Sequence, residues 1–238
     1  MTDILDIWSY LAEGQLLWLT ATIIAFLIGD GLFRLSGNKP YVNPVLISMI
    51  LLSTLLTMTN TSYRTYFEGA QFIHFLLGPA TVALAIPLWK NWQKVKSAAV
   101  PLLAALFVGS FVAMASAVAI GAAMGLEGAV LLSLVPKSAT SPVAIGVAEA
   151  IGALPTLTVA LVLITGVIGA VVTTPLNNLL CVHDYRGRGF ATGVAAHGIG
   201  TARAFQVHGT AGAFAGIGMV LNAILTALLA PLFVQIFL

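Results

Sequence analysis

An otherwise apolar segment is interrupted by Pro136-Lys137-Ser138-Ala139-Thr140-Ser141-Pro142, in which a cation lies between two prolines. A second stretch, Ala196-His197-Gly198-Ile199-Gly200-Thr201-Ala202-Arg203, has the same character. Proline and glycine in such positions predict broken helices. In a bilayer, broken backbone survives only when it is buried in protein or lines a wet cavity, and a charge there is a functional-site hypothesis. Together the two stretches predict a binding site for a small anion.

The composition indicates an integral membrane protein. The chain of 238 residues is 59% hydrophobic and only 8% charged, against about 25% charged in an average soluble domain. The net charge of +2 is small, and no basic run with interleaved aromatic residues suggests a nucleic-acid partner. The single cysteine, Cys181, allows no internal disulfide. We therefore expect an all-α polytopic protein surrounded by membrane lipid, with no nucleic acid among its partners.

Apolar segments of about 20 residues are long enough to cross a bilayer core of roughly 30 Å. By this measure six segments are candidate spans, namely residues 15–34, 43–59, 70–89, 98–123, 155–180 and 209–237. Residues 128–152 and 189–207 are also apolar, but proline, glycine and charge interrupt them. The expected fold is a single transmembrane domain over residues 1–238, with about six full helices and two broken or re-entrant segments.

The basic residues indicate how the chain is threaded, because cytoplasmic loops carry an excess of lysine and arginine. If residues 128–152 crossed the membrane once, the loop that carries Arg186 and Arg188 would lie outside, against this rule. If they dip in and return, that loop is cytoplasmic, and residues 189–207 can enter from the opposite face. Two such segments are consistent with an inverted repeat, as in transporters whose broken helices meet near the midplane.

The first stretch carries the hydrogen-bond donors of an anion site. Ser141 is well placed to cap a new helix, with Pro142 at the first helical position, where its missing N–H costs nothing. A helix that starts at membrane depth presents free N–H groups and its positive dipole end. Lys137 adds a full charge, while Ser138, Thr140 and Ser141 add hydroxyl groups. The alternative is that Lys137 extends to an interface and the hydroxyls satisfy backbone carbonyls.

The second stretch repeats this logic. Gly198 and Gly200 permit a tight break, and Thr201 is placed to cap the next half-helix. Arg203 in that half-helix offers a planar fork that binds a carboxylate with two hydrogen bonds. Histidine is the side chain that titrates nearest neutral pH, so His197 is the preferred proton-coupling candidate. The alternative for His197 is a plain hydrogen bond between helices.

Two more titratable residues are candidates for proton coupling. His74 lies in the third predicted span and can join the same cavity or serve in packing. Glu149 can pair with a cation, carry a proton or lie at an interface. No complete GxGxxG, GxSxG, HExxH or CxxC motif occurs, so the sequence predicts no enzyme, no cofactor and no metal site.

Three motifs resemble the LrgB/CidB family. They are LGPATVALAIP at residues 77–87, PKSATSP at residues 136–142 and GVAAHGIGTARAF at residues 193–205. The likeness covers nearly the whole chain in length and order. The family includes proteins of the bacterial inner membrane and resembles the C-terminal half of the plastidial glycolate/glycerate translocator of plants.

The resemblance implies two different functions. One is a secondary transporter of small carboxylates such as glycolate, glycerate, pyruvate or lactate, for which protons are the favoured coupling ion. The other is a holin/antiholin-like regulator of murein hydrolase activity and lysis, acting with an LrgA/CidA-type membrane partner. The two broken stretches favour the transporter, because a protein that only forms membrane lesions has no need of matched cations and helix starts. A homodimer stays open.

Overall fold

Every regular element of the described chain is an α-helix. The computed structural model describes residues 15–39, 41–83, 86, 89 and 92–238. These helices confirm the predicted all-α polytopic membrane protein. The chain forms two compact units, residues 1–85 and 86–238. The single domain over residues 1–238 stays a prediction.

The first unit contains three helices, α2 (Gln15–Leu35), α3 (Pro44–Met58) and α4 (Tyr63–Ala83). Helix α2 packs against both of the others. Asn43 starts α3, since its side-chain oxygen accepts hydrogen bonds from Val45 N at 2.9 Å and Leu46 N at 3.1 Å. The fully buried Trp18 of α2 meets the Tyr66 ring of α4 edge-on. These contacts fix the three helices as one small bundle.

The second unit contains α6 (Trp92–Ser97), α7 (Ala99–Ala123), α8 (Gly128–Leu132), α9 (Ser141–Ala150), α10 (Pro155–Leu179), α11 (Tyr185–Val207) and α12 (Gly209–Phe237). Among the described residues, the helices long and apolar enough to cross a membrane are α2, α7, α10 and α12. Helices α7 and α10 have 25 residues each, or about 37 Å, which exceeds the bilayer core. These helices confirm four of the six predicted spans.

The other two predicted spans are less complete. Helix α3 lies where residues 43–59 predicted it, but it has 15 residues, or about 22 Å, which is less than the bilayer core. Helix α4 covers the start of residues 70–89 and continues through Pro79. The remainder of that span falls partly outside the described residues.

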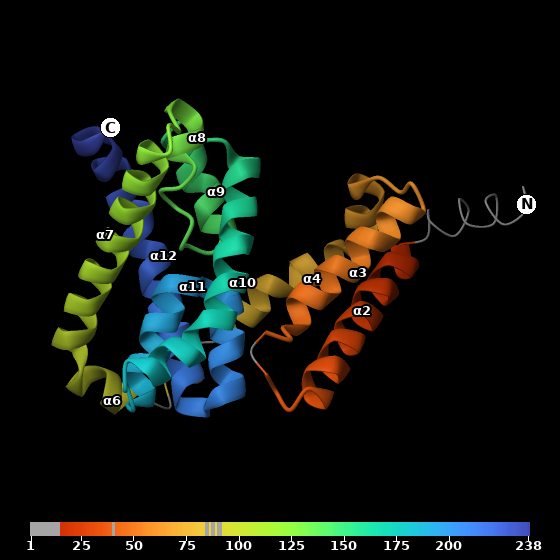
Figure 1. The fold of residues 1–238 in the computed structure, drawn as a ribbon, viewed down its shortest axis with the longest axis horizontal. Helices are drawn as coiled ribbons and strands as arrows, with labels where there is room; N and C mark the ends of the chain where they lie inside the picture. Colours follow the sequence, from red (N-terminus) through yellow and green to blue (C-terminus); the bar gives the residue numbers. More distant parts are fainter. Residues whose placement is uncertain (1–14, 40, 84–85, 87–88, 90–91) are drawn as a thin grey trace, which may run out of the picture. The chain divides into compact units, whose positions relative to one another are not determined.

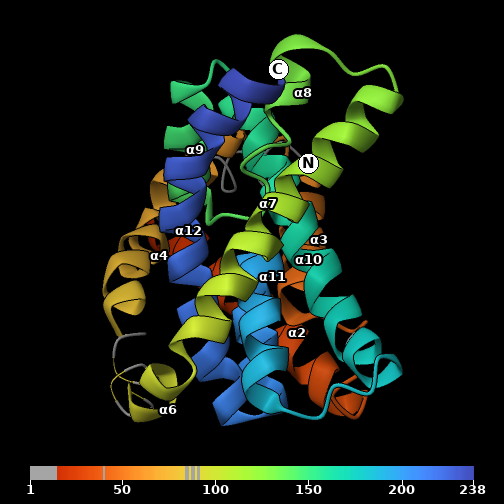
Figure 2. The ribbon, with the colours of Figure 1, turned by 90° about the vertical axis from the view of Figure 1, so that its left-hand side faces the viewer.

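Residues 128–152 form a hairpin whose two ends both lie at the same end of the second unit. Its arms are α8 and α9, joined by the non-helical residues 133–140. Ser133 Oγ accepts a hydrogen bond from Leu154 N at 3.0 Å, which ties the first arm to the start of α10. Figures 1 and 2 both show this hairpin at the end of the unit where α12 finishes. We call it hairpin 1, and we call residues 136–140 tip 1.

Helix α11 is a second hairpin, broken at Ala196 and His197, whose backbone dihedrals are not helical. Its two ends meet, because the rings of Tyr185 and His208 stack with centroids 4.2 Å apart. The return arm packs on the first arm at Gly200, where a Cβ would lie 2.6 Å from Ala196 Cβ. We call α11 hairpin 2, and we call residues 196–201 tip 2.

The two hairpins enter the second unit from opposite ends. Hairpin 1 leads into the start of α10, and hairpin 2 follows the end of α10. Since α10 is long enough to cross the membrane, the hairpins belong to opposite faces, as Figure 1 shows. Helix α7 with hairpin 1 and α10 with hairpin 2 therefore run in opposite directions, which is the arrangement expected of an inverted repeat.

Candidate functional site

Helix α12 holds the tips of both hairpins. Asn222 Nδ2 donates a hydrogen bond to the Ser138 carbonyl of tip 1 at 3.0 Å. The Thr201 hydroxyl of tip 2 lies 4.0 Å from Met219 Sδ. Because Met219 and Asn222 are three residues apart, they lie on one face of α12. The two tips therefore meet within a single turn, near the middle of this 29-residue helix.

Helix α10 joins the same two tips at Val162. The buried Val162 side chain packs with Ala139 and Ala144 of hairpin 1, while its carbonyl lies 2.8 Å from His197 Nε2 of hairpin 2. Gly166, one turn further along α10, leaves room for the imidazole, since a Cβ there would lie 2.6 Å from His197 Cε1. Two spanning helices thus fix the tips together at mid-depth.

Lys137 brings the positive charge to this meeting point. Its side chain is half-buried, and its ammonium nitrogen lies 3.4 Å from Ser138 Oγ. It is also close enough to His197 for the two groups to interact electrostatically. Lys137 of tip 1 and His197 of tip 2 therefore share one electrostatic environment.

The start of α9 differs by one residue from the prediction. Thr140, in extended conformation, is the N-cap, and Ser141 is already helical. Pro142 tolerates the second position as well as the first, because no N–H of the first turn has an intrahelical partner. Within the described chain no side chain caps this helix start, and Thr140 and Ser141 are both partly exposed. The start of α9 is therefore partly exposed and is not capped by the Thr140 side chain.

The break in hairpin 2 also differs from the prediction. It lies at Ala196 (φ −128°, ψ 17°) and His197 (φ 41°, ψ −135°) rather than at Gly198 and Gly200. Thr201 does not cap the return arm, because its hydroxyl donates to the His197 carbonyl at 2.8 Å. The bond from His197 to α10 holds the unusual backbone in place, and Gly200 serves the close approach of the arms instead.

His197 should tolerate glycine better than alanine. The Val162 carbonyl only accepts, so Nε2 must carry the proton of their hydrogen bond. Both substitutions lose that bond, but only His197→Ala keeps a side chain at φ 41°, a strain of about 1–3 kcal/mol. We expect His197→Gly to unfold at the higher temperature in detergent. Ala202→Gly, in the regular part of α11, is the control and should lower stability by about 1 kcal/mol. Equal or reversed melting temperatures for the His197 pair would contradict the strained break.

Three other predicted residues belong to different parts of the described chain. Arg203 is buried in the return arm, six residues beyond His197, and its Nη1 donates to Gln206 Oε1 at 3.3 Å. Glu149 is exposed on the last turn of α9, at the end remote from tip 1. His74 belongs to α4 of the first unit, and its side chain is outside the described residues. The structure therefore groups Lys137, Ser138 and His197, while Arg203 lies on the return arm of hairpin 2 and Glu149 lies on the last turn of α9.

The sequence analysis missed the residues of α7, α10 and α12 that hold the tips. Ser110 of α7 donates its hydroxyl proton to Asn222 Oδ1, so Asn222 links three segments of the second unit. A lone asparagine inside the apolar residues 209–237 was a signal, since polar groups in a span bond across helices or mark function. Val162 gave no signal, because it acts through its backbone carbonyl.

Removing the Asn222 amide should loosen tip 1. Asn222→Ala leaves the Ser138 carbonyl and the Ser110 hydroxyl without their partner, at about 1–3 kcal/mol for each buried group. Asn177→Ala is the control, because that amide donates to the Thr173 carbonyl of its own helix at 2.7 Å. We expect a clearly lower melting temperature in detergent for Asn222→Ala than for Asn177→Ala. Equal melting temperatures would show that Asn222 does not hold the tip.

Comparison with known proteins identifies the family of this chain. A family model described as the LrgB-like family matches residues 22–236, which include both tips and the helices that hold them. The chain belongs to the LrgB-like family. This result confirms the resemblance given by the three motifs.

Several relatives of this LrgB-like protein cover nearly its whole length. "Uncharacterized protein YxaC" of Bacillus subtilis is 37% identical over 216 residues, which are 91% of this chain and 94% of that protein. "Holin-like protein CidB" of Staphylococcus aureus is 30% identical over 222 residues, 93% of this chain and 96% of that protein. "Holin-like protein CidB" of Staphylococcus epidermidis is 31% identical over 203 residues, 84% and 87% of the two chains. No solved structure matches.

Proposed function

We propose that this LrgB-like protein is a secondary transporter of small carboxylates of the glycolate, glycerate and pyruvate type, in the cytoplasmic membrane of a bacterium. The observation that carries the proposal is the meeting of two hairpin tips within one turn of α12. Half-helices that start near the midplane bind anionic groups of substrates in other transporters. The proposal assigns transport, not catalysis, to the chain.

Tip 1 provides the groups that suit a carboxylate. The Lys137 ammonium supplies the charge, and the uncapped start of α9 supplies N–H groups at the positive end of a helix. Thr140 and Ser141 are partly exposed at that start, so their hydroxyls are placed for the hydroxyl or keto oxygen of a short acid. Arg203 lies further along the return arm, where we assign it to the path of the anion.

His197 is the group we assign to proton coupling. Its Nε2 proton is committed to the Val162 carbonyl, so an added proton must bind Nδ1. The hydrogen bond that holds tip 2 to α10 is then kept in both protonation states. A charged imidazole near Lys137 favours a bound carboxylate, which couples the proton to the substrate. Hairpin 1 separates the site from one face of the membrane, and hairpin 2 separates it from the opposite face. Movement of the protein around the tips, which stay in place, therefore exposes the site to the two faces alternately.

Uptake by the purified protein tests the proposal. We expect proteoliposomes containing this chain alone to take up labelled glycolate and pyruvate saturably, and an inward proton gradient should stimulate the rate. Saturable uptake that a proton gradient does not stimulate would contradict the proton-coupling role of His197 but would support transport by this chain. Absence of saturable uptake by a protein shown to be folded would contradict transport by this chain alone.

A holin-like function is the second candidate, and the comparisons favour it. Relatives that share most of the chain carry the name "Holin-like protein CidB". On this proposal the chain regulates murein hydrolase activity and lysis together with an LrgA/CidA-type membrane protein. Cells expressing Lys137→Met separate the two candidates, because a lysis regulator without transport should keep its effect on autolysis. Loss of the autolysis effect together with loss of uptake would tie the phenotype to the anion site.

A further inference from the structure

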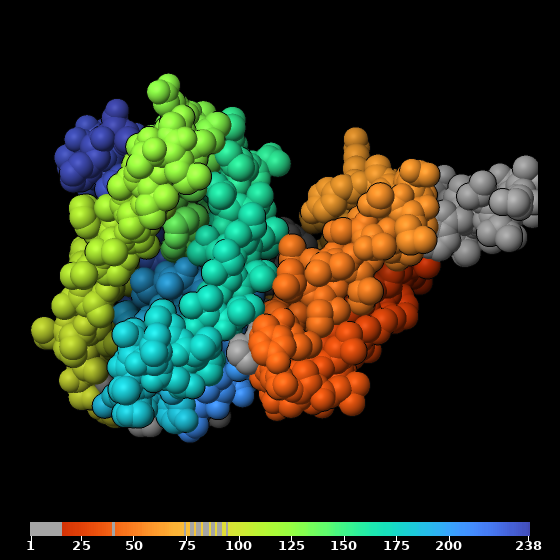
Figure 3. All heavy atoms as spheres, in the orientation of Figure 1, coloured from red at the N-terminus to blue at the C-terminus, as the bar shows by residue number. Residues whose placement is uncertain are grey.

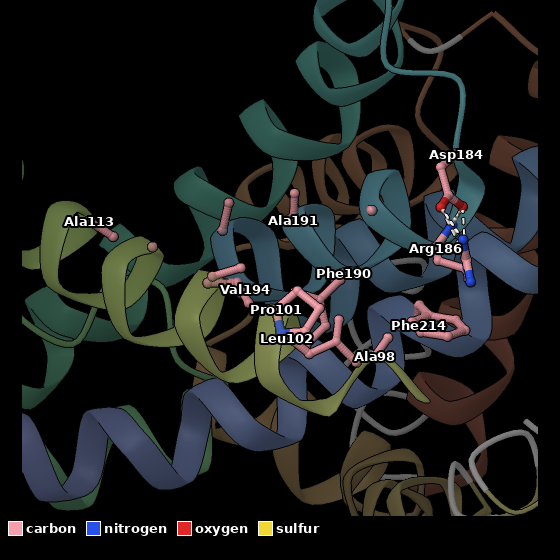
Figure 4. Close-up of a pocket in the computed structure, with 14 residues that line it drawn as sticks. Ala98, Pro101, Leu102, Ala113, Asp184, Arg186, Phe190, Ala191, Val194 and Phe214 are labelled. Atoms are coloured by element: carbon pink, nitrogen blue, oxygen red, sulfur yellow. Dashed lines mark hydrogen bonds and ion pairs between the residues drawn. The ribbon is translucent and has the colours of Figure 1, made fainter. Parts of the chain in front are cut away.

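An elongated groove in the second unit is separate from the hairpin tips. It runs between α7 and the first arm of α11, with a volume of about 490 Å³, which is in the usual range of ligand pockets. Figure 3 shows the molecule hollowed between these two helices, and Figure 4 shows the residues that line the hollow. We call it the α7–α11 groove. It does not include Lys137, His197 or Arg203.

The walls of the groove are apolar along its whole length. Ala105, Gly109 and Ala113 line it from one face of α7, and Ala191 and Val194 line it from α11. From Ala98 to Ala113 the α7 wall extends about 22 Å. Every lining residue except Asp184 and Arg186 is apolar or glycine. A carboxylate substrate has no hydrogen-bond partner along such walls, so the groove is unsuited to be its aqueous path.

The groove opens onto a surface suited to lipid. Leu103, Phe107 and Val108 of α7 have exposed fractions of 48%, 52% and 64%, and they flank the residues that line the groove. In a membrane these side chains contact acyl chains, because α7 is a spanning helix. An open apolar groove beside them is accessible to a chain of the same lipid.

The mouth of the groove carries charge at one end. Figure 4 shows Asp184 and Arg186 at the end opposite Ala113. Arg186 pairs with Asp184 at 2.7 Å, and this hydrogen bond holds the pKa of the Asp184 carboxyl below its usual range. The exposed Lys96 lies two residues before the lining residue Ala98, and Arg188 lies two residues after the lining residue Arg186. The guanidinium of Arg188 donates to Asn178 Oδ1 of α10 at 2.6 Å, so the basic residues at this end are Arg186 and Lys96. Two basic residues against the one carboxylate of Asp184 give this end a net positive charge, which suits an anionic headgroup.

We propose that the α7–α11 groove is a binding site for an anionic phospholipid. One acyl chain lies along the small residues of α7 and α11, and the phosphate lies at the mouth beside Arg186. The occupant is a lipid because apolar walls, exposure to the bilayer and a basic mouth occur together in one elongated site. The basic residues at this mouth place the lipid in the cytoplasmic leaflet.

Two neighbouring alanines of α7 give a matched test of the acyl site. Ala105 lines the groove, whereas Ala104 is equally an exposed residue of α7 but does not line it. We expect detergent-purified protein mixed with phosphatidylglycerol to retain about one lipid fewer, by native mass spectrometry, after Ala105→Phe than after Ala104→Phe. Ala191→Phe fills the groove from the opposite wall and should reproduce the loss if Ala105→Phe fails to fold.

The headgroup is tested separately. Arg186→Gln should weaken binding of phosphatidylglycerol about fivefold and leave phosphatidylcholine with the same chains unchanged, because one basic residue at a membrane surface contributes about 1 kcal/mol. Equal lipid retention by Ala105→Phe, Ala191→Phe and Ala104→Phe would overturn the proposal. A change from dimer to monomer that occurs in Ala105→Phe and Ala191→Phe but not in Ala104→Phe would also overturn the proposal, since the groove would then be an interface between copies of the chain.

Discussion

Lys137→Met is expected to lower glycolate uptake by proteoliposomes strongly at low glycolate concentration, while the protein still folds. Methionine keeps an unbranched apolar chain of similar length in the half-buried position, but it removes the charge that faces the anion. Hydrogen bonds to charged groups contribute about 1.5–3 kcal/mol, so we expect the affinity for glycolate to fall roughly 10- to 150-fold. The uptake rate at a fixed low glycolate concentration, measured against wild type, checks this expectation.

A matched control is available in Lys96→Met. Lys96 is exposed on α6, away from the hairpin tips, and its removal changes the net charge by the same amount. We expect uptake by Lys96→Met to stay close to wild type. Unchanged uptake by a folded Lys137→Met protein would exclude Lys137 from the anion site, and an equal loss in both variants would point to a general effect of charge.

Gly193→Ala is expected to cause a large loss of stability. A Cβ at Gly193 would overlap the backbone carbonyl of Ala215 on α12, and backbone atoms cannot move aside as a flexible side chain does. The first arm of hairpin 2 must then separate from α12. Overpacking of this kind costs about 1–3 kcal/mol, occasionally more, and the upper end of that range is expected for a contact with backbone. A fall in melting temperature in detergent is the measurement.

Gly187→Ala is the control for Gly193→Ala on the same arm. A Cβ at Gly187 meets no atom of the described residues within 4 Å, so alanine there gains helix propensity of up to about 1 kcal/mol. We therefore expect melting temperatures to change in opposite directions. Two equal and small effects would mean that α11 and α12 are further apart than the structure shows.

The broken segments of the fold could be predicted from sequence because membrane physics restricts them strongly. Residues 136–142 hold two prolines and a lysine, and such backbone at membrane depth has few solutions. The re-entrant form of residues 128–152 followed from Arg186 and Arg188 alone, through the excess of positive charge in cytoplasmic loops. The presence of two broken segments is therefore a property that the sequence can specify.

The details of each break could not be predicted because tertiary contacts decide them. Glycines at 198 and 200 indicated the position of the break, yet His197 takes the positive φ because its ring bonds to Val162. Gly200 is required by its contact with the other arm, and a single sequence cannot distinguish these two uses of glycine. Arg203 and Glu149 were grouped with Lys137 by residue type, but their positions depend on helix length and direction.

Protection of cysteine labels by substrate tests most directly whether the two tips form one anion site. In a Cys181→Ser background, which removes the exposed native thiol, Ser141→Cys reports on tip 1 and Gly198→Cys on tip 2, while Glu149→Cys is the control. We predict that glycolate slows maleimide labelling of both tip cysteines with the same half-maximal concentration and leaves the control unchanged. Labelling of both tips at rates independent of glycolate, in variants shown to be folded, would contradict a shared site.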